Sequence, residues 1–292
     1  MKFKSISALI LALIMCFSIA ACSKVDPDKK SDSDDMNVAA KDKVKIKFLK
    51  VGKSPCVIIR TENSVVVIDA ASEDKSGDIV TYLAEKEITT IDYLILTNYS
   101  KSCIGGVSGI LKTAGFTVKN IYEPVYAKES NTYTTYRNAV SAAGITPVKI
   151  TNGETLTIDD ATLTFYAPEK DYSTVEDEND EGNSVAVGVT HGKVGFLYTS
   201  RVNGERVTEL INQLNGKTFD IITAPDFGRY DDNYPSLFSA ASAKYAVIFA
   251  STKNPPESAT ESALKDAGIT YYVTRDGGVE AKSDGSVLEV KQ

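Results

Sequence analysis

The sequence predicts an α/β domain made of two halves, each built from strands and helices. Three observations support this fold class. Strand patterns alternate with helix patterns along the chain, 42% of the 292 residues are hydrophobic, and no Pro-, Gly- or Ser-rich linker separates the halves. This hydrophobic content allows a sizeable core and excludes general disorder. We therefore expect one folded domain over residues 43–292.

The first half of this domain alternates strands with helices. Residues 44–50 (VKIKFLK) have the period-two pattern of a half-buried strand, and 65–69 (VVVID) is a buried strand that ends on Asp69. Another buried strand, 93–97 (YLILT), leads through the loop 98–106 into a helix that Gly115 ends. The other elements predicted here are strands 56–60 and 118–122 and helices 77–86 and 132–143.

The second half opens with a hairpin and continues through an acidic segment. Seven acids in residues 169–182 indicate a solvated loop; a bound cation is the alternative, although no regular ligand spacing is present. His191-Gly192-Lys193 is predicted to be a turn between two strands. The elements predicted in this half are strands 154–158, 161–167, 184–190, 194–199, 219–223 and 245–250, helices 204–214 and 258–267, and a last strand group over 270–290.

The N-terminus has the pattern of an export signal. Lys2 and Lys4 precede an apolar run at residues 8–17, and Ile19-Ala20-Ala21-Cys22 resembles a bacterial lipobox, in which the cysteine becomes the diacylated N-terminus. An ordinary signal peptide is the alternative. We predict a lipoprotein signal peptide over 1–21, lipidation of Cys22 and a polar tether over 22–42. The protein would then be anchored by lipid to the cell membrane and face outside the cytoplasm.

Charge argues against nucleic-acid binding unless one face is locally basic, and histidine content excludes one kind of metal site. The chain carries 32 Lys and Arg against 39 Asp and Glu, a net charge of −7. Without the two lysines of the signal peptide the net charge is −9, whereas nucleic-acid phosphates require clustered cations. We therefore do not expect a nucleic-acid partner. The single histidine, His191, excludes a poly-histidine metal site.

Several motifs resemble the metallo-β-lactamase-fold hydrolases, most closely their ComEC-type competence branch. Residues 94–97 (LILT) followed by 104–106 (IGG) resemble a strand that the family continues with His-x-His-x-Asp-His and then Ile-Gly-Gly. Residues 67–70 (VIDA) resemble the strand that ends in Asp-(Ala/Thr)-Gly, and the resemblance extends from residue 43 to 290. It implies a four-layer αβ/βα sandwich, and the family's chemistry is metal-assisted hydrolysis.

The same resemblance implies that the metal ligands of the family are replaced in this chain. Neutral amide and hydroxyl oxygens are weak zinc ligands, and an arginine brings positive charge to the place of a cation. We therefore expect no metal, no cofactor and no catalytic residue of the family's type. The vestigial metal-ligand positions are Asn98, Ser100, Ser102, Cys103, Arg201 and Asp226. The retained motif residues are Asp69, Gly105 and Gly106.

Other catalytic groups have weaker support. A Cys103–His191 dyad could supply a nucleophile and a base, but the predicted place of His191 is a turn at the outer end of a strand pair. A Ser/Lys arrangement at residues 100–102 lacks any supporting motif. We therefore interpret His191 as a surface residue and residues 100–102 as solvated.

An acidic and aromatic segment follows Asp226. A cation site formed by Asp226, Asp231 and Asp232 is one reading, and an exposed acidic turn is the favoured one. Tyr230 and Tyr234 lie in the same segment, where a binding pocket is one reading and ordinary core or surface packing is favoured.

Two cysteines remain in the folded domain, and the resemblance places both beside the vacated cavity. Cys103 is in the last ligand position, and Cys56 begins the second strand. A Cys56–Cys103 disulfide would close a loop of about 48 residues and add roughly 4 kcal/mol in the chain-entropy model. Two reduced, buried cysteines are the alternative.

These observations favour a monomeric, membrane-tethered domain that binds an unidentified ligand or envelope protein and has no catalytic activity. The alternative is a hydrolase of the ComEC-type branch, acting on a phosphodiester or similar substrate through a rebuilt site. A purely structural role in an envelope assembly is a third class.

Overall fold

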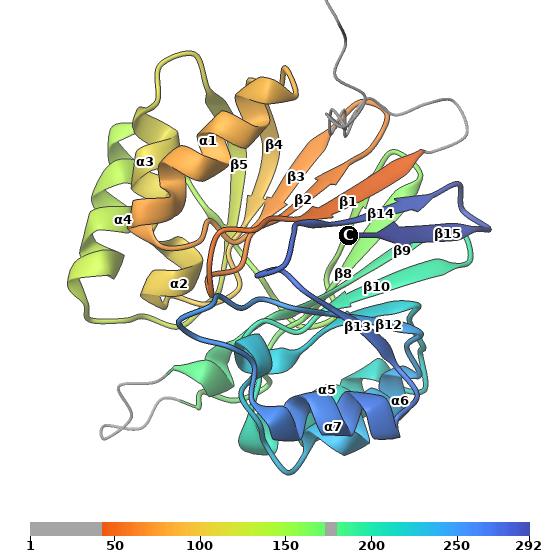
Figure 1. The fold of residues 1–292 in the computed structure, drawn as a ribbon. Coiled ribbons are helices and arrows are strands. Elements are labelled where there is room, and N and C mark those ends of the chain that lie inside the picture. The colour runs from red at the N-terminus through yellow and green to blue at the C-terminus, as the bar shows by residue number, and fades with distance from the viewer. Residues whose placement is uncertain (1–42, 173–179) are drawn as a thin grey trace, which may run out of the picture. The chain divides into compact units, whose positions relative to one another are not determined.

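The computed structural model describes residues 43–172 and 180–292 (Figure 1). The predicted signal peptide, Cys22 and the whole of the predicted tether lie outside these residues, as does part of the acidic segment, residues 173–179. In the described ranges, no helix has both the length and the apolar character needed to cross a membrane.

The first sheet contains the N-terminal strands together with the last two strands of the chain. Among the described residues it has eight strands, in the order β15-β14-β1-β2-β3-β4-β5-β6. These strands are β1 (Val44–Phe48), β2 (Val57–Arg60), β3 (Val65–Ile68), β4 (Thr90–Ile95), β5 (Thr117–Glu123), β6 (Val148–Lys149), β14 (Val279–Ser283) and β15 (Leu288–Lys291). The helices of this half are α1 (Ser76–Glu85), α2 (Lys101–Ile104), α3 (Val107–Lys112) and α4 (Asn131–Ala142), with the 3-10 helix η1 (Glu73–Lys75).

The second sheet contains the middle of the chain. In the part that the structure describes it has seven strands, in the order β13-β12-β11-β10-β9-β8-β7. These strands are β7 (Thr155–Ile158), β8 (Ala161–Tyr166), β9 (Ala186–His191), β10 (Val194–Tyr198), β11 (Ile221–Thr223), β12 (Tyr245–Ile248) and β13 (Thr270–Val273). Its helices are α5 (Gly204–Leu214), α6 (Tyr234–Ala241) and α7 (Ser258–Asp266), with the 3-10 helices η2 (Glu181–Asn183) and η3 (Pro225–Gly228).

The two sheets pack against each other, and helices cover their outer faces (Figure 1). Phe48 of β1 meets Phe196 of β10 edge to face, with 5.2 Å between the ring centroids, and both side chains are buried. β3 (VVVI) is buried along its whole length, as expected for a strand whose two faces are both covered. The fold is the predicted four-layer αβ/βα sandwich, so the fold-class prediction is confirmed.

Three parts of the predicted organisation are wrong in detail. The last strand group is divided between the sheets, because β13 extends the second sheet while β14 pairs antiparallel with β1 in the first. Helix α6 was not predicted, and the predicted loop 98–106 contains the short helix α2. His191 is the last residue of β9 and is buried, whereas a surface turn was expected.

Candidate functional site

A cleft opens where strands of both sheets end. β3 and β4 run parallel, as do β10 and β11, so the carboxyl ends of each pair lie at the same edge. The segments after these four strands carry Asp69, Asn98, Arg201 and Asp226. The cavity has a volume of about 1140 Å³. The residues that line it are Lys53, Ser54, Ser72, Glu73, Asp74, Tyr99, Ser100, Lys101, Ser102, Gly105, Lys128, Ser130, Thr132, Asp180, Arg201, Asp226, Phe227 and Arg229.

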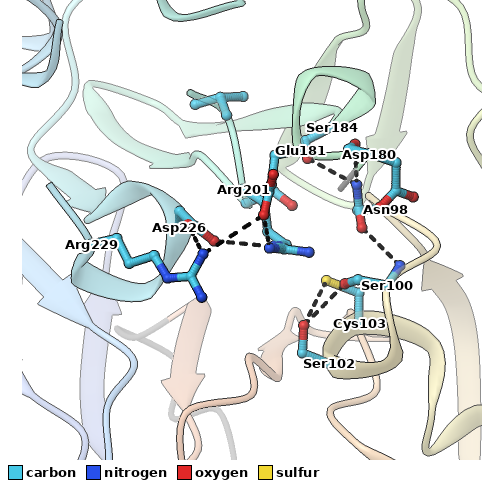
Figure 2. A network of polar contacts seen from close by, with 12 residues as sticks. Asn98, Ser100, Ser102, Cys103, Asp180, Glu181, Ser184, Arg201, Asp226 and Arg229 are labelled. Carbon is cyan, nitrogen blue, oxygen red and sulfur yellow. Dashed lines mark hydrogen bonds and ion pairs between the residues drawn. The ribbon is translucent and has the colours of Figure 1, made fainter. Parts of the chain in front are cut away.

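An arginine stands at the centre of this site. The Arg201 Nε donates to Asp226 Oδ1 at 3.0 Å, and the Arg201 guanidinium also forms an ion pair with Glu181 (Figure 2). Only 11% of the Arg201 side chain is exposed, and the two carboxylates are 5% and 7% exposed. Arg229 NH1 approaches Asp226 Oδ2 at 3.3 Å from the solvent side. Asp226 therefore lies between two guanidinium groups.

Asn98 is engaged by its own loop and by the segment before β9. Its side chain is buried, donates to Asp180 O at 2.8 Å and to Ser184 Oγ at 3.1 Å, and accepts from Ser100 N at 2.8 Å (Figure 2). The amide thus joins the loop after β4 to the beginning of the segment that leads into β9. The hydrogen bonds of Asn98 therefore hold these two segments together.

The two serines and the cysteine that follow carry no charge. Ser100 Oγ and Ser102 Oγ are 3.0 Å apart, and both serines line the cleft. Cys103 is fully buried behind them, and burial raises the pKa of its thiol. The neutral thiol is neither an activated nucleophile nor a ready metal ligand.

This set of side chains does not fit the metal ions that the fold family implies. The charged centre already consists of a guanidinium paired with two carboxylates. The other positions offer an amide, two hydroxyls and a protonated thiol, which bind zinc poorly. Over residues 43–172 and 180–292, no three His, Cys, Asp or Glu side chains form a group that could hold a metal ion.

Asp69 lies beneath the cleft and contacts both sheets. Its carboxylate accepts from Thr97 N at 2.9 Å, Thr97 Oγ1 at 2.6 Å and Tyr198 OH at 2.5 Å. Burial raises the pKa of Asp69 to about 6, although the hydrogen bonds from Thr97 and Tyr198 act in the opposite direction. Asp69 therefore positions the strand ends and does not face the cavity.

The backbone around the cleft is conformationally unusual. Asp69 (φ 56°), Ser200 (φ 52°), Asp226 (φ 41°) and Phe227 (φ 60°) all adopt left-handed conformations, which side chains other than glycine rarely do. Such residues concentrate where the surrounding structure holds the backbone in a required shape. Tertiary contacts, and not the conformational preferences of these residues alone, therefore hold the backbone at the strand ends of this site.

The two retained glycines allow a close approach between segments. A Cβ at Gly106 would lie 2.1 Å from Ala70 O, and one at Gly105 would lie 2.5 Å from Lys101 O and 2.6 Å from Glu73 N. The loop after β3 therefore packs directly on the backbone of residues 105 and 106. This contact positions the loop that carries Ser100 and Ser102.

The structure separates the other predicted groups. His191 lies at the end of β9 away from the cleft, where its Nδ1 is 2.9 Å from Ser283 Oγ, so no dyad with Cys103 forms. Asp231 accepts from Gly204 N at 2.9 Å and Asn233 N at 2.8 Å, which makes it a structural residue at the start of α5. Tyr234 is buried and donates to Val202 O at 3.1 Å, as expected for a core residue.

Cys56 and Cys103 are both free thiols and both fully buried. Of the two alternatives, the structure thus contains the reduced pair. Burial raises the pKa of the Cys56 thiol as well. Two protonated sulfur atoms therefore contribute apolar volume under the cleft.

Sequence reasoning missed two charged residues of the site. Glu181 belongs to the acidic segment that was interpreted as solvated, yet it is 6% exposed because it pairs with Arg201. Lys53 lies between β1 and β2 and lines the cleft. Its position between the predicted strands 44–50 and 56–60 was the available signal.

Two solved structures are similar to this chain in fold. The metallo-β-lactamase fold protein YhfI from Bacillus subtilis is 13% identical, with a TM-score of 0.50, and the match covers 85% of this chain and 99% of that one. The E377D mutant of CmlA β-hydroxylase is 12% identical, with a TM-score of 0.52 over 79% of this chain and 52% of that one. This chain thus spans about half of CmlA.

At these identities the likeness concerns the fold alone. The protein has the metallo-β-lactamase fold. No protein-family profile matches the sequence, and no curated protein sequence is detectably similar to it.

Proposed function

We propose that this protein is a lipid-anchored, extracytoplasmic metallo-β-lactamase-fold protein, related to the ComEC-type branch, that has lost its metal ligands and binds a ligand in the cleft without turning it over. The observation that carries this proposal is the Arg201 guanidinium held between Asp226 and Glu181. A fixed positive charge there opposes the entry of a metal cation, and hydrolysis in this fold family depends on such ions.

The test of the inert centre combines elemental analysis with an activity assay. We expect the purified full-length chain to contain no stoichiometric zinc, manganese or iron, and to release no p-nitrophenol from bis(p-nitrophenyl) phosphate above the buffer rate. Close to one ion per chain would contradict the proposal. Turnover that disappears in Asp226→Asn would instead support the alternative, a hydrolase with a rebuilt site.

The lipid anchor is tested separately, because it depends on the N-terminal sequence. Cys22 follows small residues in the lipobox register, and we expect Cys22→Ala to release the protein from membranes or leave it unprocessed. Cys16→Ala is the matched control, since Cys16 lies within the apolar run, and it should be processed and retained normally. Normal cleavage and membrane retention of Cys22→Ala would contradict the anchor.

A further inference from the structure

The cleft contains both cationic and anionic side chains around Arg201. Three cationic side chains, Lys53, Arg201 and Arg229, lie around two carboxylates, Asp226 and Glu181. Both carboxylates are already engaged by the two arginines. Of these three cations, Lys53 is the one that forms no ion pair with a carboxylate of the described residues.

Lys53 is half-buried beside two other cations. Within residues 43–172 and 180–292 it has no hydrogen-bonded acceptor and no ion-paired carboxylate within 4 Å. Burial lowers the pKa of the Lys53 ammonium, and the positive charges of Arg229 and Arg201 act in the same direction, whereas the carboxylates of Asp226 and Glu257 act against it. A partly desolvated ammonium near a second cation is favourable only when an anion compensates it.

Hydroxyl donors line the same cavity. The Oγ atoms of Ser100 and Ser102 are 3.0 Å apart, a separation that lets both reach oxygens of one tetrahedral anion. Arg229 is 52% exposed and uses NH1 for its contact with Asp226, so the remaining donors of its guanidinium are available to a ligand. Cations combined with hydroxyl donors form strong, charge-assisted hydrogen bonds with oxyanions.

We propose that the cleft binds the phosphate group of a phosphate monoester through Lys53 and Arg229, with Ser100 and Ser102 as hydroxyl donors. This inference rests on the proposed binding role of the cleft and names the chemistry of its ligand. The cavity of about 1140 Å³ is far larger than one phosphate ion, so the phosphate is one end of a larger molecule. That molecule is either a soluble metabolite or a lipid with a phosphate headgroup.

Calorimetric titration of the full-length chain in detergent with phenyl phosphate tests the inference. We expect Lys53→Met to weaken binding by at least about tenfold, and Lys53→Arg to stay within about threefold of the unaltered protein, because the charge is kept. Lys193→Met is the matched control, since Lys193 is exposed in the turn after β9, and it should bind like the unaltered protein. Equal affinities of Lys53→Met and Lys193→Met, or no binding of phenyl phosphate at all, would overturn the inference.

Vesicles separate the two sources of the phosphate. We compare vesicles of phosphatidylcholine with vesicles that also contain phosphatidic acid, using Cys22→Ala protein, which carries no lipid. The phosphatidylcholine vesicles measure any binding through an uncleaved signal peptide. Binding only to phosphatidic acid, lost in Lys53→Met and displaced by phenyl phosphate, indicates a lipid headgroup. Binding of phenyl phosphate without vesicle binding indicates a soluble monoester, and both outcomes support the inference.

The inference and the proposed function fail in different ways. Release of inorganic phosphate from phenyl phosphate by the bound protein would contradict the inert centre but leave the phosphate specificity intact. Absence of phosphate binding together with absence of metal and turnover would overturn the inference while the inert centre stands.

Discussion

Tyr198, the last residue of β10, donates a hydrogen bond of 2.5 Å to Asp69, which follows β3 in the opposite sheet. Both side chains are almost completely buried, so the bond lies in an environment of low polarity. It connects the two sheets directly beneath the cleft. The ends of β3, β4 and β10 are thereby held together by one carboxylate and its donors.

Tyr198→Phe tests the strength of this connection. Hydrogen bonds to charged groups contribute about 1.5–3 kcal/mol, so we expect the free energy of unfolding at pH 7 to fall by that amount. The measurement is urea denaturation. Tyr234→Phe is the control, because its hydroxyl donates to the neutral Val202 carbonyl, and its loss should cost about 1 kcal/mol. Equal losses of unfolding free energy in the two variants would show that the hydrogen bond to the Asp69 carboxylate is no stronger than one to a neutral carbonyl.

Asp69 makes stability depend on pH. Its folded pKa of about 6 lies above the unfolded value near 3.9, so the folded state binds the proton more tightly. The stability that Asp69 contributes is therefore complete below about pH 4 and is lost as the pH rises through 6. Between pH 4 and pH 7, we expect Asp69→Asn to gain about 2 kcal/mol relative to the unaltered protein. A difference between the two proteins that stays constant over this range would contradict the raised pKa.

Arg201→Gln tests the buried ion-pair network. Removal of one partner leaves Asp226 and Glu181 as buried carboxylates close to each other, and we expect a loss of about 3–5 kcal/mol in the free energy of unfolding. Lys244→Gln removes the partner of Asp220 at the surface, where the lysine is 72% exposed, and should cost less than about 1 kcal/mol. A double variant, Arg201→Gln with Asp226→Asn, should recover part of the loss. Similar stabilities of Arg201→Gln and Lys244→Gln would show that Arg201 is dispensable to the fold.

Gly106→Ala tests the close approach beneath the cleft. A methyl group there would lie 2.1 Å from Ala70 O, so the backbone must move, and we expect a loss of at least about 2 kcal/mol. Gly77→Ala in α1 meets no atom within 4 Å and should gain about 0.5–1 kcal/mol. Thermal unfolding of both variants decides between these directions. A neutral Gly106→Ala would mean that the two segments separate easily.

The thiols of Cys56 and Cys103 should be unreactive in the folded protein. Both are buried, and burial raises the pKa of each, so the reactive thiolate is scarce at neutral pH. In protein whose Cys16 and Cys22 are replaced or removed, Ellman's reagent should detect no thiol before unfolding and both thiols in guanidinium chloride. A mass two units lower under non-reducing conditions would identify a disulfide instead.

The strand ends of the fold were predictable, because local pattern determines them. Buried hydrophobic runs such as 65–69 and 93–97 show where a strand ends. Parallel pairing then places the carboxyl ends of the strands at one edge of the sheet. The pairing of β14 with β1 was not predictable, since it joins residues more than 230 positions apart and no local pattern records it. Helix α6 (YPSLFSAA) is short and begins with a tyrosine and a proline, so its helical periodicity is difficult to detect in the sequence.

The site was predictable only where the family motifs extend. Asn98, Arg201 and Asp226 occupy positions that the resemblance identifies, and the structure brings their segments together. Glu181 was missed because an acidic stretch is usually solvated, and only the tertiary contact with Arg201 makes this residue different. His191 was predicted at the surface because its contact with Ser283, which lies on a strand distant in the sequence, is also a tertiary contact.

The guanidinium of Arg201 is covalently part of the chain, unlike an inorganic ion at the same place. Under the proposed function, such a centre is complete once the polypeptide has folded, because no ion has to be loaded or exchanged. The positive charge of this centre belongs to an amino-acid side chain and is not supplied by trace elements from the surroundings. On the proposed function, we therefore expect zinc starvation to leave both the amount and the folding of this protein unchanged.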